Sequence, residues 1–167
     1  MKKFFCIFMC LIMLNGCVKE NKKDVKKEPL SVSGFSAVVN TKVNDVEISA
    51  NIEYSMNDIL IFTLTSPETL QGTIIECNNG EYKLSYEGLN FSLPNKKLPF
   101  NMVCKTVETC INNVQGTTPT EEIDNMLVFT YQIDTHICKL YTDKEKRFIK
   151  LIINEEEILT FTNFEYL

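Results

Sequence analysis

Three side chains that could support acid–base or thiol chemistry alternate in the stretch DTHICKLY: Asp134, His136 and Cys138. His136 is the sole histidine of the chain and so its sole imidazole base. On a strand, His136 and Cys138 would share a face but lie about 6.5–7 Å apart, which is poor for direct proton transfer. The sequence also has no Gly-x-Ser-x-Gly motif and no phosphate-binding glycine loop. It therefore predicts no enzyme activity and no catalytic residue.

Four cysteines, Cys138 among them, belong to the body of the chain, at positions 77, 104, 110 and 138. They could form two disulfides in three possible pairings, or remain reduced as buried apolar side chains. Their spacing contains no Cys-x-x-Cys, and a single histidine cannot complete the usual zinc ligand sets. We therefore predict no metal site and no cofactor, and both states of the cysteines remain open.

The N-terminus carries the most specific chemical motif. Lysines at positions 2 and 3 precede 11 apolar residues, 4–14, a pattern typical of a secretory signal and too short for a transmembrane helix, which needs about 20. Leu14-Asn15-Gly16-Cys17 then resembles the lipobox of bacterial lipoproteins, although Asn15 stands where Ser, Ala, Val or Thr is usual. The resemblance implies cleavage before Cys17, a diacylglyceryl group on its sulfur, and an amino terminus acylated by a chain such as palmitate. An ordinary signal peptide is the alternative.

This motif predicts the organisation and location of the protein. Residues 1–16 form a lipoprotein signal peptide, and residues 17–32 form the lipidated N-terminus with a disordered tether, since they are lysine-rich and lack an apolar period. Residues 33–167 form a single domain. Two or three acyl chains on Cys17 would anchor it stably, which makes the membrane its partner and the extracytoplasmic face its location.

The charge of the domain excludes one class of partner. Residues 33–167 carry 19 acidic and 10 basic side chains, a net charge of −9. Nucleic-acid binding needs a basic surface, so we expect no nucleic-acid partner.

Most of the domain alternates apolar and polar residues with period two, which predicts antiparallel strands separated by polar turns. Expected strands cover residues 35–43, 46–54, 59–65, 89–93, 126–133, 136–141, 147–153 and 157–164, with two more in the hairpin GTIIECNNGEYKLSY, 72–86. Asn79-Gly80 suits a two-residue type I′ turn in that hairpin. The resulting register pairs Cys77 with Tyr82, Glu76 with Lys83, and Ile75 with Leu84.

The apolar period becomes helical after Pro99. Seven apolar residues then share about 120° of helical arc: Phe100, Val103, Cys104, Val107, Cys110, Ile111 and Val114. Pro99 suits the first turn of a helix and Gly116 a C-terminal cap. Cys104 and Cys110 lie at opposite margins of this face, six residues apart on one helix, and cannot readily form a disulfide with each other. If either forms a disulfide, its partner should be Cys77 or Cys138.

Together these elements predict a mainly β (α+β) domain: an antiparallel half-barrel of about ten strands wrapped around one amphipathic helix. Residues 59–64 and 149–153 are apolar on both faces, and a helix of about 15 residues is only about 22 Å long. The rest of the inner face must collapse on itself or accept a guest. The candidate ligand-binding residues are Phe62, Tyr82, Phe91 and Phe129.

The stretch FTLTSPETLQGTIIECNNGEYKLSYEGLNFSLPNKKLPF, residues 62–100, resembles uncharacterised lipoproteins of Firmicutes. Those are similar to the superfamily of the lipoprotein carriers LolA and LolB and of the sigma-factor regulator RseB. The resemblance implies a half-barrel that often holds acyl chains on its concave side. We expect a membrane-anchored extracytoplasmic lipoprotein that binds a hydrophobic ligand, such as lipid or lipoprotein acyl chains. The alternative is a non-enzymatic protein-interaction or envelope-sensing module of the RseB type, whose concavity is filled by its own side chains.

Overall fold

The computed structural model describes residues 28–43, 45–55, 57–78, 80–93, 99–133 and 135–167. The signal peptide, Cys17 and most of the expected tether lie outside these described residues. So do Asn79 of the expected type I′ turn and Asp134, the neighbour of the histidine.

Eleven strands and one α-helix are formed by the described residues of the domain. The first six strands are β1 Phe35–Val43, β2 Val46–Tyr54, β3 Ile59–Ser66, β4 Ile74–Asn78, β5 Glu81–Tyr86 and β6 Leu89–Leu93, with a short 3₁₀ helix, η2 Glu68–Leu70, after β3. The helix α2 Pro99–Val114 follows, and then β7 Glu121–Ile123, β8 Met126–Ile133, β9 His136–Thr142, β10 Phe148–Ile153 and β11 Glu156–Tyr166. The fold class predicted from the sequence is therefore confirmed.

One strand was not expected. β7 has three residues and none of them is buried, so it carries no apolar period. The ten predicted strands agree with the structure to within about two residues at each end, which is the usual uncertainty of element boundaries.

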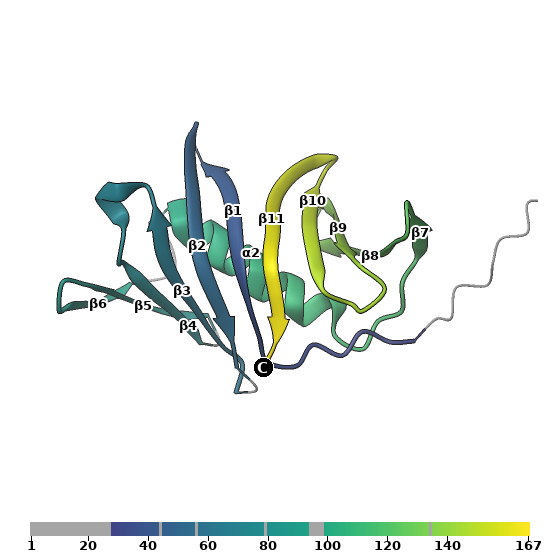
Figure 1. Cartoon of the computed structure of the whole chain (residues 1–167), viewed down its shortest axis with the longest axis horizontal. Coiled ribbons are helices and arrows are strands. Elements are labelled where there is room, and N and C mark those ends of the chain that lie inside the picture. Colours follow the sequence, from purple (N-terminus) through teal and green to yellow (C-terminus); the bar gives the residue numbers. More distant parts are fainter. Residues whose placement is uncertain (1–27, 44, 56, 79, 94–98, 134) are drawn as a thin grey trace, which may run out of the picture.

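All eleven strands form one antiparallel sheet, in the order β6-β5-β4-β3-β2-β1-β11-β10-β9-β8-β7. It consists of two meanders, β1 to β6 and β7 to β11, whose first and last strands pair in the middle. The chain ends of the domain meet there: the Leu167 N–H donates to the Gly34 carbonyl at 2.9 Å. The sheet is open, with β6 and β7 as its edges, and α2 joins these two edges by crossing one face (Figure 1).

The core lies between that face, called the inner face here, and α2. One row of alternating strand residues runs across five strands on the inner face: Ala37, Ile52, Phe62, Ile75 and Leu84. The first four are buried and Leu84 is half-buried. The helix contributes its predicted apolar stripe, in which Val103, Cys104, Val107, Cys110, Ile111 and Val114 are all buried. The Phe100 side chain lies outside the described side chains.

Aromatic rings hold the two meanders together where β1 meets β11. Phe35 on β1 stacks on Phe164 of β11 with ring centroids 4.7 Å apart, and Phe148 of β10 lies 5.4 Å from Phe35. Offset and tilted ring pairs at these separations stabilise a core beyond their buried area. The pairing of first and last strands is thus supported by side chains as well as by the backbone.

The ordered domain begins before Ser33. The Leu30 side chain is buried, its N–H donates to the Thr117 carbonyl, and its carbonyl accepts from Gly116 N–H, both at 2.8 Å. Val32 N–H donates to the side-chain Oε1 of Gln115 at 2.7 Å. Residues 30–32 are therefore tied to the C-terminal end of α2, and Gly116, with φ +73°, ends the helix as expected.

Candidate functional site

The hairpin formed by β4 and β5 has the register expected from its turn. Cys77 pairs with Tyr82 and Ile75 with Leu84, while Glu76 and Lys83 pair on the outer face with their charged groups 3.2 Å apart. Gly80 has φ +81°, the left-handed conformation that a type I′ turn requires. The next hairpin repeats this design, because Glu87 and Gly88 have φ of 47° and 82°.

This second turn places an apolar group at the sheet edge. It pairs Leu84 with Phe91 and Tyr86 with Leu89, so all four side chains share the inner face. Leu89 is 60% exposed and Phe91 48%, whereas Leu84 and Tyr86 are half-buried. We call these four residues the edge patch. It prolongs the buried inner-face row beyond Ile75, and none of its members is charged.

The edge patch is exposed because the cover provided by α2 stops at Tyr82. The Tyr82 hydroxyl donates to Glu108 Oε2 at 3.3 Å, and the Gly80 N–H donates to Glu108 Oε1 at 3.2 Å. Burial raises the pKa of Tyr82 well above its ordinary value, with the negative charge of Glu108 as the next contribution. The carboxylate therefore holds the helix over the end of the hairpin next to Gly80, and Leu84, Leu89 and Phe91 lie farther from it along the strands.

The four aromatic residues predicted to bind a ligand have different positions. Phe62, Phe129 and Tyr82 are 0%, 1% and 4% exposed and pack in the core beneath α2. Only Phe91 of the four presents its ring at the surface, within the edge patch. Its neighbours Leu84, Tyr86 and Leu89 were not among the residues predicted to bind a ligand. The dipeptide Glu87-Gly88 could have revealed them, since a two-residue turn there sets this register.

A separate open cleft of about 430 Å³ lies where β1 and β2 diverge from β11. Its lining residues are Asn40, Thr41, Lys42, Glu47, Ile48, Ser49, Ile158, Leu159 and Thr160. Two of its three hydroxyl side chains are hydrogen-bonded within the protein: Ser49 Oγ donates to Asn40 Oδ1, and Thr41 Oγ1 donates to the Ile158 carbonyl, both at 2.7 Å. The cleft therefore offers few free hydroxyl groups to a ligand.

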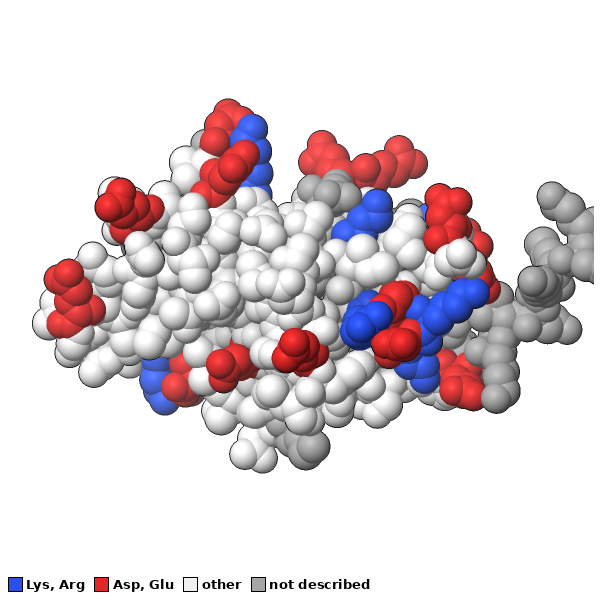
Figure 2. Space-filling view, viewed as in Figure 1, with Lys and Arg blue, Asp and Glu red and all other residues white. Residues whose placement is uncertain are grey.

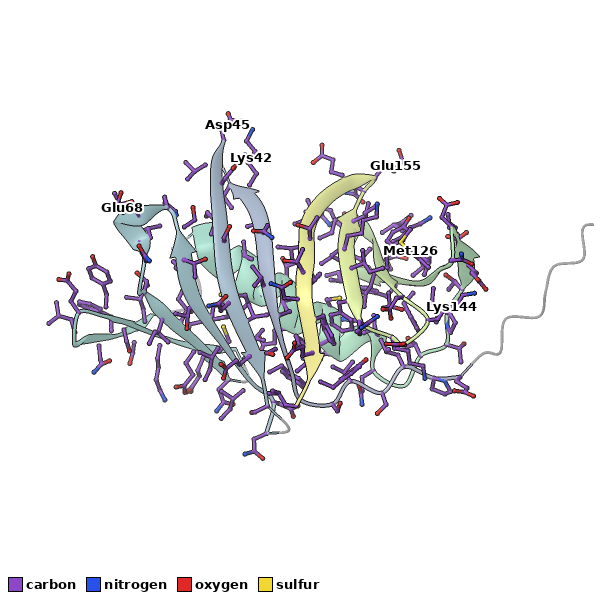
Figure 3. All side chains as sticks on the ribbon, viewed as in Figure 1. Lys42, Asp45, Glu68, Met126, Lys144 and Glu155 are labelled. Atoms are coloured by element: carbon purple, nitrogen blue, oxygen red, sulfur yellow. The ribbon has the colours of Figure 1, made fainter. Side chains whose placement is uncertain are left out.

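The outer face of the central strands is uncharged over a wide area. Figure 2 shows white surface over the middle of β2 and β1, with charged side chains toward the periphery and a few acidic ones in the lower part of this face. Figure 3 places Lys42 and Asp45 together at the tip of the β1–β2 hairpin, where their charged groups are 3.0 Å apart, and Glu155 at the tip between β10 and β11. Exposed ion pairs of this kind contribute little to stability.

The candidate thiol–imidazole pair is not assembled. His136 is exposed at the start of β9, while Cys138 is buried, and burial raises the pKa of the Cys138 thiol. Among the described residues, no group of three or more His, Cys, Asp or Glu side chains could hold a metal ion. Within the same part of the chain, no helix is both long enough and apolar enough to span a membrane.

No model of a known protein family matches the sequence, and no curated protein matches it. The solved structures that are similar in fold include two that can be compared directly. An uncharacterized conserved protein from Thermus thermophilus has a TM-score of 0.48 at 10% identity, covering 81% of this chain and 79% of that one. A LolA superfamily protein from Nitrosomonas europaea has a TM-score of 0.43 at 10% identity, covering 83% and 88%. Both scores lie below 0.5, so we base the proposals below on this chain's own residues.

Proposed function

We propose that this protein is a membrane-anchored extracytoplasmic lipoprotein that binds a hydrophobic ligand, such as lipid or the acyl chains of another lipoprotein, at the edge patch. The anchor is supported by Leu14-Asn15-Gly16-Cys17 at the end of a short apolar run. The ligand site is supported above all by one observation: Leu89 and Phe91 are 60% and 48% exposed on the inner face of an edge hairpin.

The chemistry of the patch favours an apolar guest. Leu84 and Phe91 continue the row that contains Phe62 and Ile75, so a guest lying on them would extend the core. Fully burying a side chain of the size of Leu89 or Phe91 stabilises a complex by about 1.5–3 kcal/mol. No member of the patch carries a charge that would select a phosphate, a carboxylate or an amine. An alkyl chain satisfies these conditions.

The described N-terminal segment and the edge patch lie at opposite ends of the domain. The N-terminal segment is tied to the C-terminal end of α2, where Leu30 bonds to Gly116 and Thr117. In Figure 1 this segment leaves at one end of the long axis, and the β5–β6 hairpin lies at the other end. The edge patch therefore lies at the end of the domain opposite to the segment that follows the expected tether.

A second candidate function follows from the filled inner face. Phe62, Tyr82 and Phe129 occupy the core under α2, as an interaction module with a self-filled concavity requires. The edge strand β6 is uncharged, whereas the other edge, β7, contains Glu121 and Glu122. Charges are a common protection of edges against pairing with another strand, so β6 is the edge that would accept an added strand from a partner protein.

Titration of a fluorescent fatty acid tests the first function. The chain from Val18 onward, which lacks the anchor, should bind saturably. Leu89→Gln and Phe91→Gln should each weaken binding about tenfold or more, since either change removes the apolar contact. Ile137→Gln is the matched control, because Ile137 is 55% exposed on β9, outside the patch, and should leave binding unchanged.

Lipid binding by the wild type and one further variant separate the two candidates. If wild-type protein binds no fatty acid saturably and copurifies with no lipid in native mass spectrometry, the acyl-ligand function is wrong. Asn90→Pro then tests the edge strand. In an antiparallel hairpin, hydrogen-bonded and non-hydrogen-bonded residue pairs alternate, and the pair next to a two-residue turn is hydrogen-bonded. The next pair, Ser85 and Asn90, is therefore not hydrogen-bonded, and the Asn90 N–H points to the free edge of β6. Proline at position 90 removes this donor and should abolish strand addition while sparing an acyl site.

A further inference from the structure

The four buried cysteines form two groups between α2 and the sheet. Cys77 lies on the inner face of β4, next to Tyr82 across the hairpin. Glu108, which accepts a hydrogen bond from Tyr82, is one helical turn after Cys104 and on the same side of α2. This contact places Cys104 above Cys77, and both thiols are buried in the same core cluster.

The other two cysteines are related differently. Cys138 on β9 pairs with Tyr131 on β8, and Cys110 approaches them from α2. The Tyr131 hydroxyl is buried and has no hydrogen-bond partner among the described residues. Cys110 belongs to the buried core cluster and Cys138 does not, whereas Cys77 and Cys104 share that cluster beside the contact between Tyr82 and Glu108.

We propose that Cys77 and Cys104 form a disulfide that fastens the beginning of α2 to β4, and that Cys110 and Cys138 remain thiols. The bond closes a loop that contains the hairpin turns, β5 and β6. It joins the helix and sheet at the place where Tyr82 and Glu108 already meet, next to the edge patch but independent of any ligand there.

The oxidant is a disulfide, either a small-molecule disulfide or the active-site disulfide of a thiol oxidoreductase. The thiolate of one cysteine attacks a sulfur of that disulfide, breaks its S–S bond and forms a mixed disulfide, with release of one thiol of the oxidant. The thiolate of the other cysteine then attacks the protein sulfur of the mixed disulfide and releases the second thiol. Two electrons and the two protons of Cys77 and Cys104 end on the oxidant.

Burial determines when this reaction takes place. Both thiols are inaccessible in the folded domain, and burial raises the pKa of the Cys104 thiol well above its ordinary value. The thiolate is the reactive species, so the folded, reduced protein should react slowly. Oxidation should be fast while α2 is undocked during folding. Once formed, the bond should resist reductants until the domain unfolds, because the same burial excludes them.

Refolding of the chain from Val18 onward in a buffer of oxidised and reduced glutathione tests the proposal. Non-reducing peptide mapping should find Cys77 joined to Cys104, and alkylation in denaturant should label Cys110 and Cys138. The melting temperature of the oxidised protein should exceed that of the reduced protein by about 5–10 °C. Cys77→Ala and Cys104→Ala should both abolish this difference, whereas Cys110→Ala and Cys138→Ala should keep it.

Peptide mapping of the wild-type chain keeps the test independent of whether an alanine variant folds. Four thiols that all remain reduced after refolding in this buffer would overturn the proposal. A bridge that involves Cys110 or Cys138 would overturn it as well. So would equal rates of oxidation for the folded and the denatured reduced chain, because the buried geometry described above requires the folded chain to be slower.

Discussion

The Tyr82 hydroxyl donates a hydrogen bond to Glu108 Oε2 at 3.3 Å, which joins the β4–β5 hairpin to the middle of α2. The second oxygen of this carboxylate accepts from the Gly80 N–H at 3.2 Å. One helical side chain thus satisfies a buried hydroxyl and a backbone donor of the turn. The place where the helix stops covering the inner face depends on this contact.

Removing this contact should destabilise the domain. Tyr82→Phe should lower the free energy of unfolding by about 0.5–1.5 kcal/mol, and Glu108→Ala by about 1–3 kcal/mol, because the alanine leaves two donors without their acceptor. Urea unfolding measures both. Tyr86→Phe is the matched control, since among the described residues the Tyr86 hydroxyl has no hydrogen bond. Equal losses for Tyr82→Phe and Tyr86→Phe would contradict the assignment.

Stability at alkaline pH should depend on Tyr54. Its hydroxyl donates to Asp58 Oδ1 at 2.6 Å. Burial, then the hydrogen bond and the charge of Asp58, raise the pKa of Tyr54 from 10.0 to about 12. Because the folded-state pKa is the higher one, the stabilisation is complete below about pH 10 and is lost as the pH rises towards about 12.

Comparison of wild type with Tyr54→Phe isolates this group from the other buried tyrosines and cysteines, which both proteins retain. Between about pH 10 and pH 12, the free energy of unfolding of the variant should fall by ~2 kcal/mol less than that of the wild type. Urea unfolding across this range gives the two curves. Parallel curves would show that Tyr54 titrates alike in the folded and unfolded chains.

Residues 30–32, which follow the expected tether, should contribute to the stability of the folded domain. Leu30→Ala should cost about 2–5 kcal/mol of unfolding free energy, because Leu30 is buried among core residues. Limited trypsin digestion should cut among the lysines at positions 19–27 and leave a core that keeps its melting temperature. A chain that begins at Glu28 should melt like that core, and one that begins at Ser33 should melt lower. If the two truncated chains had the same melting temperature, the contacts of Leu30 would not stabilise the domain.

Membrane attachment should depend on Cys17. The wild-type chain, expressed in a bacterium, should partition into the detergent phase and incorporate a palmitate analogue. Cys17→Ser should do neither, because serine lacks the sulfur that carries the diacylglyceryl group. Asn15→Ala restores a usual lipobox residue and should process at least as fast as the wild type. Equal labelling of the wild type and Cys17→Ser would rule out lipidation at this residue.

Local features of the sequence predicted the elements and much of their pairing. Gly80 and its preceding asparagine predicted the register Cys77–Tyr82 because a two-residue turn leaves one possible alignment of the strands beside it. The 3.6-residue period after Pro99 predicted the buried face of α2 in the same way. In both cases the determining contacts lie within a few residues of each other, so a short window of sequence contains them.

Contacts between distant segments decided the rest. A period of two shows that a strand has two faces, but it does not show which strand lies beside it or how far a helix covers it. Phe62 and Phe91 look alike in sequence, yet Phe62 lies under α2 and Phe91 lies beyond it. The pairing of β1 with β11, the burial of Leu30 and the contact of Tyr82 with Glu108 depend likewise on residues that are far apart along the chain. Their partners are set by the packing of the whole domain, which no local pattern records.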